Sequence, residues 1–368
     1  MDVGAGAELS YILGHYNLGE LVWYEQDQRG YINTSFAIQT EKDGKRKKYF
    51  LRRYKKGVRQ EELLFEHSLI NHLSAKNFTI IARVYKTRQG STYVYVAGEN
   101  EGQNGVYYAI FDFLGGEDRY TWIAPSCTPT EIASSAEVLA EFHRLARDLS
   151  TSGRRSEPRI LELLPQIEGN LCDCLQHPKG SVFDEYLIEN AETIFRAIEQ
   201  TKAALLRHPS GSMIDLVIHC DFHPGNLKFE GEQVVGLFDF DWSKIDLRCY
   251  DVAHAIWYFF ACWDADRDGE IRLDDCEIFL ATYQDVLLKK PGLEPMTHIE
   301  LSCLPYMIAA ANLYVLNWTI LDYLHKEVDP EAYLVFLKHG VNTIRWLGNE
   351  PNRIRLEEIL EGVRNPDV

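Results

Sequence analysis

The chain has 368 residues, a length that suits two lobes with separate cores better than one ordinary domain. Apolar residues make up 46% of it and charged residues 25%, which excludes a disordered chain. A formal net charge of −17 disfavours nucleic acids and anionic membranes as main partners. Residues 1–112 hold 15 basic and 13 acidic side chains, so the negative charge falls in the remainder. That remainder suits a metal ion or a cationic substrate, or is simply a solubilising surface.

The cysteines and the apolar segments indicate a cytoplasmic protein. Eight cysteines show no Cys-x-x-Cys pair, which favours free thiols in a reducing compartment. The first twenty residues lack the basic and apolar regions of a signal peptide. The most apolar stretch, Pro305–Leu324, contains Asn312, Asn317 and Asp322. It therefore predicts a buried helix rather than a membrane span.

The first third of the chain is rich in strand signals, with one helical segment among them. Strands are expected in Gly30–Ile38, Lys48–Tyr54, Ser91–Ala97 and Val106–Phe113, and a helix in Glu61–Leu73. This order predicts a small antiparallel sheet with one helix. The glycine connector at 114–116 places the lobe boundary after residue 113, which gives an N-terminal nucleotide-binding lobe (1–113) and a C-terminal catalytic and substrate lobe (114–368).

Beyond residue 128 the chain becomes mainly helical. Thr128-Pro129-Thr130-Glu131 is a helix start signal, and the helix is expected to run to about Leu149. A polar loop at 151–158 precedes helices over much of 160–207. Strand signals return only in Ile214–Phe240, after which the pattern is helical again.

One segment concentrates the chemistry. An apolar strand leads into the loop His219-Cys220-Asp221-Phe222-His223-Pro224-Gly225-Asn226, and a β-hairpin turning near residue 232 follows. Its register places Asn226 and Asp239 at the same open end, where amide and carboxylate oxygens suit Mg²⁺. Asp221 lies five residues before Asn226 and is free to act as a base toward a substrate hydroxyl.

This segment resembles the catalytic motif of the aminoglycoside phosphotransferase and choline kinase family, which has a protein-kinase-like fold. The continuation from Asp239 to Ala253 is especially similar to type II homoserine kinases. The resemblance implies that Asp221 is the catalytic base, that Asn226 and Asp239 bind Mg²⁺, and that His219 and Asp251 are structural.

Two further positions in this segment are defined by the same resemblance. Cys220 stands where the family often has glycine. His223 is expected either to touch phosphate or substrate or to shape the loop.

The N-terminal lobe resembles the family more loosely. Gly30, Asn33 and Ser35 lie in a segment similar to the family's nucleotide-binding loop. The segment around Phe111 and Phe113 is similar to the hinge, where backbone groups bind adenine.

A basic residue on the second expected strand corresponds to the strand lysine of kinases, which contacts the α and β phosphates. Arg52 and Arg53 are both candidates and point to opposite faces of the strand; the resemblance favours Arg52. Glu66 is the expected helix partner, with Glu62 as the rival and a solvated helix face as the alternative. Arginine binds phosphate well but does not replace lysine in every respect.

A second pattern lies at Asp264–Asp275. It matches an EF-hand calcium loop at positions 1, 3, 5, 6 and 8, with Asp in place of Glu at position 12. It predicts either a Ca²⁺ site or an acidic connector between two helices.

These observations together predict an α+β, two-lobed protein-kinase-like fold with a five-stranded N-lobe, one helix in that lobe and a helical C-lobe. The resemblance implies an ATP- and Mg²⁺-dependent kinase that phosphorylates a hydroxyl of a small molecule, such as an amino alcohol, a homoserine-like compound or an aminosugar. The alternatives are a non-catalytic nucleotide-binding regulator, a calcium-binding interaction protein on an inactive kinase scaffold, and a protein Ser/Thr kinase. The last lacks the His-Arg-Asp, Asp-Phe-Gly and Ala-Pro-Glu signatures.

Overall fold

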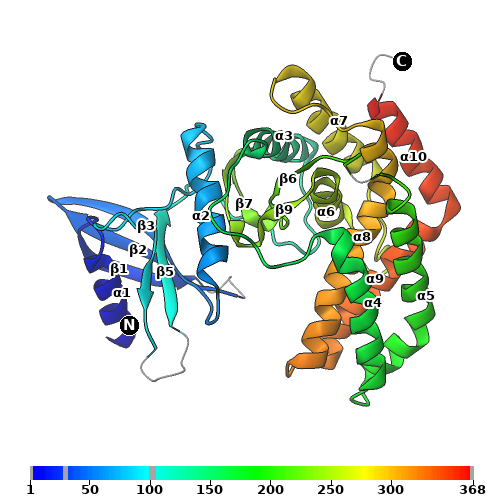
Figure 1. Cartoon of the computed structure of the whole chain (residues 1–368), viewed down its shortest axis with the longest axis horizontal. Coiled ribbons are helices and arrows are strands. Elements are labelled where there is room, and N and C mark those ends of the chain that lie inside the picture. The colour runs from blue at the N-terminus through cyan, green and yellow to red at the C-terminus, as the bar shows by residue number, and fades with distance from the viewer. Residues whose placement is uncertain (1–2, 28–31, 99–104, 210, 365–368) are drawn as a thin grey trace. The chain divides into compact units, whose positions relative to one another are not determined.

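A computed structural model of the chain describes residues 3–27, 32–98, 105–209 and 211–364. The chain divides into two compact units, which Figure 1 shows in blue to cyan and in green to red for most of their length. The N-terminal unit comprises Met1–Gly116, Leu149–Arg155 and Val235–Asp241. The C-terminal unit comprises Glu117–Asp148, Ser156–Val234 and Trp242–Val368. We describe each unit by itself.

A five-stranded antiparallel sheet forms the centre of the N-terminal unit. Its order is β1-β2-β3-β5-β4, with strands β1 (Glu20–Asp27), β2 (Thr34–Lys42), β3 (Lys45–Arg53), β4 (Val94–Val96) and β5 (Val106–Asp112). Strands β2 and β3 join through Asp43-Gly44, both with positive φ, as a two-residue hairpin of this twist requires. The five-stranded sheet confirms the predicted fold class.

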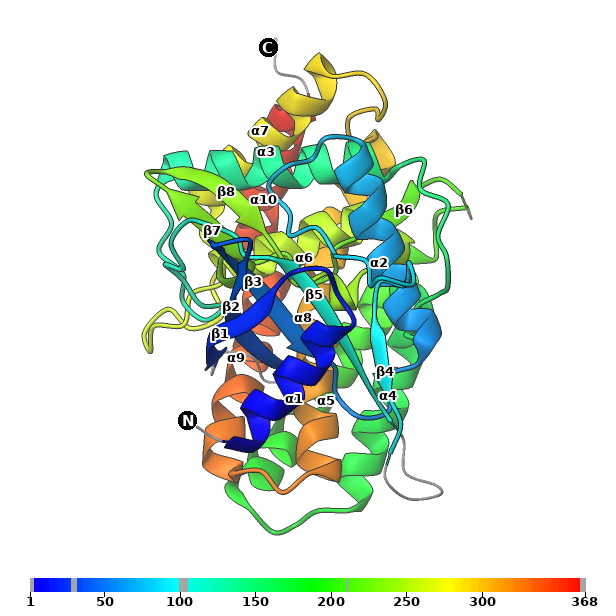
Figure 2. The same ribbon diagram turned by 90° about the vertical axis from the view of Figure 1, so that its left-hand side faces the viewer.

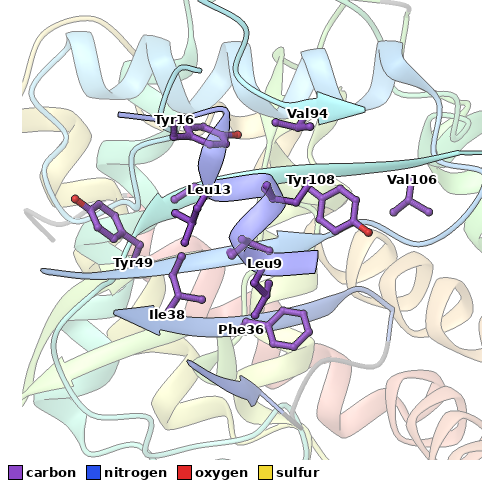
Figure 3. Packing of buried hydrophobic residues seen from close by; sticks show 12 residues of the cluster. Leu9, Leu13, Tyr16, Phe36, Ile38, Tyr49, Val94, Val106 and Tyr108 are labelled. Carbon is purple, nitrogen blue, oxygen red and sulfur yellow. The ribbon is translucent and has the colours of Figure 1, made fainter. Parts of the chain in front are cut away.

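In the described part of this unit two helices accompany the sheet, one more than predicted: α1 (Val3–Gly14) and α2 (Gln60–Ala75). In Figure 2, α1 crosses in front of the strands. Leu9, Leu13 and Tyr16 pack with alternate residues of the strands, including Phe36 and Ile38, in one buried cluster (Figure 3). The helix was missed because its glycine-containing sequence has weak helix propensity, and its stability comes from this packing.

Within the described residues, eight helices make up most of the C-terminal unit. They are α3 (Pro129–Ala146), α4 (Ile160–Gln176), α5 (Val182–Leu205), α6 (Arg248–Phe260), α7 (Leu273–Lys289), α8 (His298–His325), α9 (Pro330–Gly348) and α10 (Glu350–Arg364). Helix α8 packs against α4, α5, α6 and α9, and so forms the centre of this unit (Figure 1). Two short sheets complete the chain: β6 (Asp215–Ile218) with β9 (Lys244–Leu247), and β7 (Leu227–Glu230) with β8 (Gln233–Leu237).

Helix α3 begins where the sequence predicts. The Thr128 side chain accepts a hydrogen bond from the backbone N–H of Glu131, the Glu131 carboxylate accepts one from the Thr128 backbone, and Pro129 occupies the first turn. This capping box satisfies N–H groups that the helix cannot pair internally. The helix ends at Ala146, three residues before the expected end.

Helix α8 contains the apolar stretch that predicts a buried helix. Its polar residues are paired inside the unit: Trp257 Nε1 donates to Asn312 Oδ1 at 3.1 Å, and Asn170 donates to Asn317 at 2.8 Å. Among the described residues it is the one helix long and apolar enough to cross a membrane, and 67% of its most apolar window is buried. A buried helix at the centre of the unit accounts for this composition.

The loop between α6 and α7 differs from a calcium site. Both carboxylate oxygens of Asp268 are taken by the neighbouring helix, one by His339 Nδ1 at 2.6 Å and one by Asn342 Nδ2 at 2.8 Å. Gly269, with φ of 84°, lies close to the backbone of α9, where a Cβ would clash. In the described parts of the chain no three His, Cys, Asp or Glu side chains gather as metal ligands. The loop is therefore a connector docked on α9, and the hypothesis of a Ca²⁺ site is not supported.

Candidate active site

The loop after β6 is held by one buried carboxylate. Oδ2 of Asp251 accepts the backbone N–H of His219, and Oδ1 accepts that of Cys220, both at 2.8 Å. Cys220 has φ of 64°, in the left-handed region that glycine adopts at least cost. Glycine would suit this conformation, and the hydrogen bonds that the backbone N–H groups of His219 and Cys220 donate to Asp251 stabilise it with cysteine instead.

Asp251 is itself fixed by a second buried residue. His143 Nε2 lies 2.9 Å from Asp251 Oδ2, and His143 Nδ1 lies 2.7 Å from the hydroxyl of Tyr283. Burial lowers the pKa of His143, so the ring is neutral, with Nε2–H donating to Asp251 and Nδ1 accepting from Tyr283. Burial acts to raise the pKa of Asp251, but the hydrogen bonds that it accepts from His143 and from the backbone N–H of His219 outweigh burial and lower that pKa. A charged Asp251 thus anchors α6 to the loop, as expected.

Three side chains of the C-terminal unit surround Asp221. Asn226 Nδ2 donates to Asp221 Oδ2 at 3.0 Å, and Tyr258 donates its hydroxyl proton to Oδ1 at 3.0 Å. His223 Nε2 lies 3.5 Å from Oδ2. The Asp221 side chain keeps 20% of its surface exposed, so it is oriented by neighbours without being closed off from a substrate.

The electrostatic surroundings favour a charged Asp221. Burial acts to raise the pKa of Asp221, but the charge and hydrogen bond of His223 lower that pKa below its usual range. The carboxylate is therefore ionised at neutral pH and ready to accept a proton.

Tyr258 is a candidate functional residue that sequence reasoning missed. It lies on α6, seven residues after Asp251, so one helix face carries both the residue that anchors the loop and the residue that contacts Asp221. That spacing was the available signal, but an aromatic residue on a helix is usually part of a core.

Gly225 shapes the loop by being small. A Cβ at this position would lie 3.0 Å from the His223 ring and 3.2 Å from the backbone of Thr121. Pro224–Asn226 form a short 3-10 turn that directs Asn226 back toward Asp221. A side chain at 225 would push apart the two segments that meet there.

In the N-terminal unit, Arg52 joins two carboxylates. Its Nη1 donates to Glu66 Oε1 at 3.2 Å, and its Nη2 donates to Asp239 Oδ1 at 2.8 Å. Tyr54 donates its hydroxyl proton to the other oxygen of Glu66 at 2.8 Å. Burial acts to lower the pKa of Arg52, but Asp239 and Glu66 raise it. Burial also raises the pKa of Glu66 to about 7, against the influence of Arg52.

The contacts of Arg52 bear on two choices that the sequence left open. One is the basic residue of the strand, and the other is its acidic partner on the helix. Arg53 lies on the other face of β3, half-exposed, 3.7 Å from Glu8. Glu62 contacts Arg59 at 3.3 Å, whereas Glu66 contacts Arg52. The pairing favours Arg52 and Glu66, and their contact with a nucleotide stays a prediction.

Gly30, Asn33 and Ser35 were also predicted to bind the nucleotide. Gly30 lies outside the described residues. Asn33 donates to Asp241 Oδ2 at 2.8 Å and accepts from the Lys55 backbone at 3.0 Å, which ties the turn before β2 to the segment after β8. Ser35 is buried on β2, opposite Arg52 on β3.

The two predicted hinge residues differ in their surroundings. Phe111 is buried within β5 and makes an edge contact with His67 at 5.7 Å between ring centroids. Phe113 lies just beyond the end of β5, is 41% exposed and has Lys48 Nζ 5.4 Å from its ring. Their roles in adenine binding remain predictions.

The predicted magnesium ligands belong to different units, and each is described in its own surroundings. The amide nitrogen of Asn226 donates to Asp221, so the amide oxygen of Asn226 points away from this carboxylate. Asp239 has φ of 69°, with its side chain 35% exposed and one oxygen bonded to Arg52. Amide and carboxylate oxygens fit Mg²⁺, which completes its shell with water and phosphate oxygens.

Comparison with known proteins decides the family. The model of the phosphotransferase enzyme family, known as APH, matches residues 23–285. The chain belongs to this family. Homoserine kinase of Afipia carboxidovorans is 27% identical to this phosphotransferase over 360 residues, covering 94% of this chain and 96% of that one. Homoserine kinase of Rhodopseudomonas palustris is 26% identical over 381 residues, covering 100% and 96%. The phosphotransferase is thus a small-molecule kinase.

Solved structures confirm the kinase-like fold of the phosphotransferase. A microcompartment-associated aminopropanol kinase matches with a TM-score of 0.70 at 16% identity, covering 95% of this chain and 98% of that one. A spectinomycin phosphotransferase, solved with ADP and spectinomycin, matches with a TM-score of 0.62 at 14% identity, covering 97% and 98%. At these identities the likeness concerns the fold alone.

Proposed function

We propose that this phosphotransferase transfers the γ-phosphate of ATP to the hydroxyl of a small amino alcohol or homoserine-like acceptor, with Asp221 as the catalytic base. The observation that carries the proposal is the fixed, charged Asp221, which Tyr258 and Asn226 orient on a loop that Asp251 anchors. The named relatives, which match over nearly the whole chain, support a homoserine-like acceptor.

The residues of this chain have distinct roles in the proposed reaction. Asp221 accepts the hydrogen bond of the acceptor hydroxyl and takes its proton as the oxygen attacks phosphorus. Arg52, kept in place by Glu66, offers N–H donors to the nucleotide phosphates. Most of the rate enhancement would come from positioning and electrostatics, because phosphoryl transfer asks for little covalent chemistry from the protein.

Asn226 and Asp239 would hold Mg²⁺. They flank the paired strands β7 and β8, one residue before the first and two residues after the second, which is the basis for assigning them to one ion. When bound, Mg²⁺ neutralises charge on the phosphate oxygens. Asp239 would then exchange part of its contact with Arg52 for the ion.

ATP is the proposed donor because the chain is a kinase and a protein of the same fold is solved with ADP. A cytoplasmic location is also proposed, and the eight cysteines, which form no disulfide, are consistent with it. The relatives' names give no support to a protein substrate.

ADP release from a panel of acceptors tests the proposal. Purified protein is incubated with ATP, Mg²⁺ and homoserine, amino alcohols, aminosugars or diols, and the phosphorylated product is identified by mass spectrometry. We expect acceptor-dependent ADP release with homoserine or an amino alcohol, and none with the Asp221→Asn variant. A protein that binds ATP but phosphorylates nothing in the panel would instead fit a nucleotide-binding regulator.

A further inference from the structure

Three aromatic side chains of the C-terminal unit gather at its surface and have no role in the proposed reaction. Trp122 stacks on Phe336 of α9, with ring centroids 5.5 Å apart and planes 22° apart. Trp263 meets both rings edge to face, at 5.6 Å from Trp122 and 6.0 Å from Phe336. All three residues are half-buried, so part of each is open to solvent. We call Trp122, Trp263 and Phe336 the aromatic wall.

The aromatic wall begins one side chain away from the proposed base. The ring of Trp122 lies edge to face with that of Tyr258, at 6.1 Å between centroids. Tyr258 donates its hydroxyl proton to Asp221, and the ring of His223 lies 4.9 Å from the Tyr258 ring. Tyr258 is itself half-buried. An acceptor whose hydroxyl lies at Asp221 therefore has an aromatic surface beside it on this side.

Trp122 belongs to a segment that lies against the catalytic loop. A Cβ on Gly225 of that loop would lie 3.2 Å from the Thr121 carbonyl carbon, so the two backbones are in close contact. Ala124, two residues after Trp122, has φ of 49°, a left-handed conformation that is strained for alanine. The chain thus holds Trp122 near Asp221 at a cost in backbone strain.

The loop between α6 and α7 supports the other side of the wall. Trp263 stacks on His339 with ring centroids 3.6 Å apart and planes 6° apart. His339 in turn is held by Asp268, at 2.6 Å between Nδ1 and Oδ1. Arg272, later in the same loop, donates at 3.2 Å to a backbone carbonyl of the segment that carries Trp122. The acidic loop that resembles a calcium site in sequence therefore fixes the positions of two of the three rings.

A contiguous group of partly exposed aromatic rings beside a reaction centre is typical of a ligand site. Single exposed apolar residues are normal on a protein surface, whereas a group of them marks a place where something binds. Apolar surface left in water is unfavourable until a ligand covers it. The wall carries no charged or hydroxyl group. It therefore suits an apolar part of a ligand better than further hydroxyl groups, which would lose their hydrogen bonds to water there.

We infer that the aromatic wall binds an apolar substituent of the acceptor while the acceptor's hydroxyl lies at Asp221, which makes Trp122 a specificity-determining residue. This inference rests on the proposed function and narrows it to acceptors that carry an alkyl or ring substituent. Aminosugars, which present many hydroxyl groups, would gain little from the wall.

The test varies the apolar substituent alone. The full-length protein is assayed with ATP, Mg²⁺ and amino alcohols of the formula HOCH2–CH(NH2)–R, in which R grows from hydrogen through methyl, ethyl and propyl to butyl. The hydroxyl and the amine keep their spacing throughout the series. The measured quantity is kcat/KM for each R relative to that for R = hydrogen. In wild type we expect this ratio to rise about threefold with each carbon, because each added group leaves water.

In Trp122→Ala the rise over the whole series should shrink to less than about twofold, because the surface that covers the substituent is lost. Trp122→Phe restores a ring and should recover most of the rise. Tyr11→Ala is the control. It removes a ring of α1 that is 60% exposed and meets His15, and we expect it to keep the wild-type rise.

The outcomes for the inference and for the proposed function are distinct. A folded Trp122→Ala protein that keeps the wild-type rise overturns the inference. So does a wild-type protein that phosphorylates every member of the series with equal kcat/KM, although the proposed function then stands.

If wild-type protein phosphorylates no member of the series, the proposed function fails, and the wall is tested by calorimetric titration with the same amino alcohols. Affinity that increases with R in wild type and not in Trp122→Ala supports the wall. An equal dependence on R in the two proteins, or binding in neither, overturns it.

Discussion

The hydroxyl of Tyr258 donates a hydrogen bond to Oδ1 of Asp221 at 3.0 Å, and so joins helix α6 to the proposed catalytic base. Asp251, on the same helix, holds the backbone of the loop that carries this base. One helix therefore fixes both the loop and the side chain that it presents.

Replacing Tyr258 by Phe removes the donor and keeps the ring. We expect kcat to fall about tenfold with little change in the KM for ATP, because one charge-assisted hydrogen bond that orients the base is lost. Steady-state kinetics measure this split. Tyr333→Phe, which removes a hydroxyl bonded to Asp322 at 3.1 Å, is the matched control and should keep its kcat. An unchanged kcat in Tyr258→Phe would show that Asn226 alone suffices to orient Asp221.

Asp221→Asn keeps the size of the side chain and removes its basicity. We expect turnover to fall by about 10²- to 10⁴-fold, because general-base help is lost. The melting temperature and ATP binding should stay near the wild-type values, since the side chain is partly exposed and α6 still anchors the loop. Near-normal turnover in a folded variant would refute the assignment of Asp221.

The proposed metal ligands predict different magnesium responses. Asp239→Ala should abolish Mg²⁺-dependent turnover, since it removes the charged ligand. Asn226→Ala should raise the Mg²⁺ concentration needed for half-maximal rate, with partial rescue at high Mg²⁺, since a neutral ligand contributes less. Rates measured against Mg²⁺ at saturating ATP test both. Wild-type Mg²⁺ dependence in either variant would remove that residue from the site.

Arg52 should matter for stability as well as for nucleotide binding. Arg52→Ala leaves Glu66 buried without its cation and should lower the free energy of unfolding by about 3–5 kcal/mol. Arg53→Ala removes a half-exposed pair 3.7 Å apart and should change it by less than about 1 kcal/mol. Urea unfolding of the two variants makes the comparison, and equal effects would contradict the assignment of Arg52 as the buried strand cation.

His254 predicts a loss of stability in acid. Burial lowers the pKa of His254 to about 4, below its unfolded value of 6.5. Between these values the unfolded chain binds the proton and the folded protein does not, so the contribution is fully present above pH 6.5 and is lost as the pH falls toward 4. At pH 5 the loss is about 2 kcal/mol.

His254→Phe keeps the stacking with Tyr250 and Tyr258 and breaks no hydrogen bond to a described residue. Its free energy of unfolding should therefore fall less than that of wild type between pH 7.5 and pH 5. Chemical denaturation at both values measures the difference. Parallel losses in the two proteins would contradict a low pKa for His254.

The sequence predicted those parts of the fold that depend on neighbouring residues. The capping box at Thr128 and Glu131, the strands β7 and β8, and the polar loop from His219 to Asn226 all follow from patterns within a few residues. Such patterns are informative because turns, caps and strand alternation are local interactions. The same reasoning identified the segment that carries Asp221, and the resemblance of that segment to a known motif indicated the family.

Contacts between side chains far apart in the chain were decided only by the tertiary structure. The sequence offered Arg52 or Arg53 and Glu66 or Glu62, and packing of α2 beside β3 selected the pair that meets. It did not single out Tyr258, because the helical spacing from Asp251 equally fits a core residue. It left α1 out because packing on the sheet, rather than propensity, makes that helix stable. It also matched Asp268 to a calcium loop, whereas docking on α9 occupies both of its oxygens. Long-range packing leaves no pattern within a short stretch of sequence. The sequence could therefore predict the segment that carries the chemistry of this kinase, but not the distant side chains that position it.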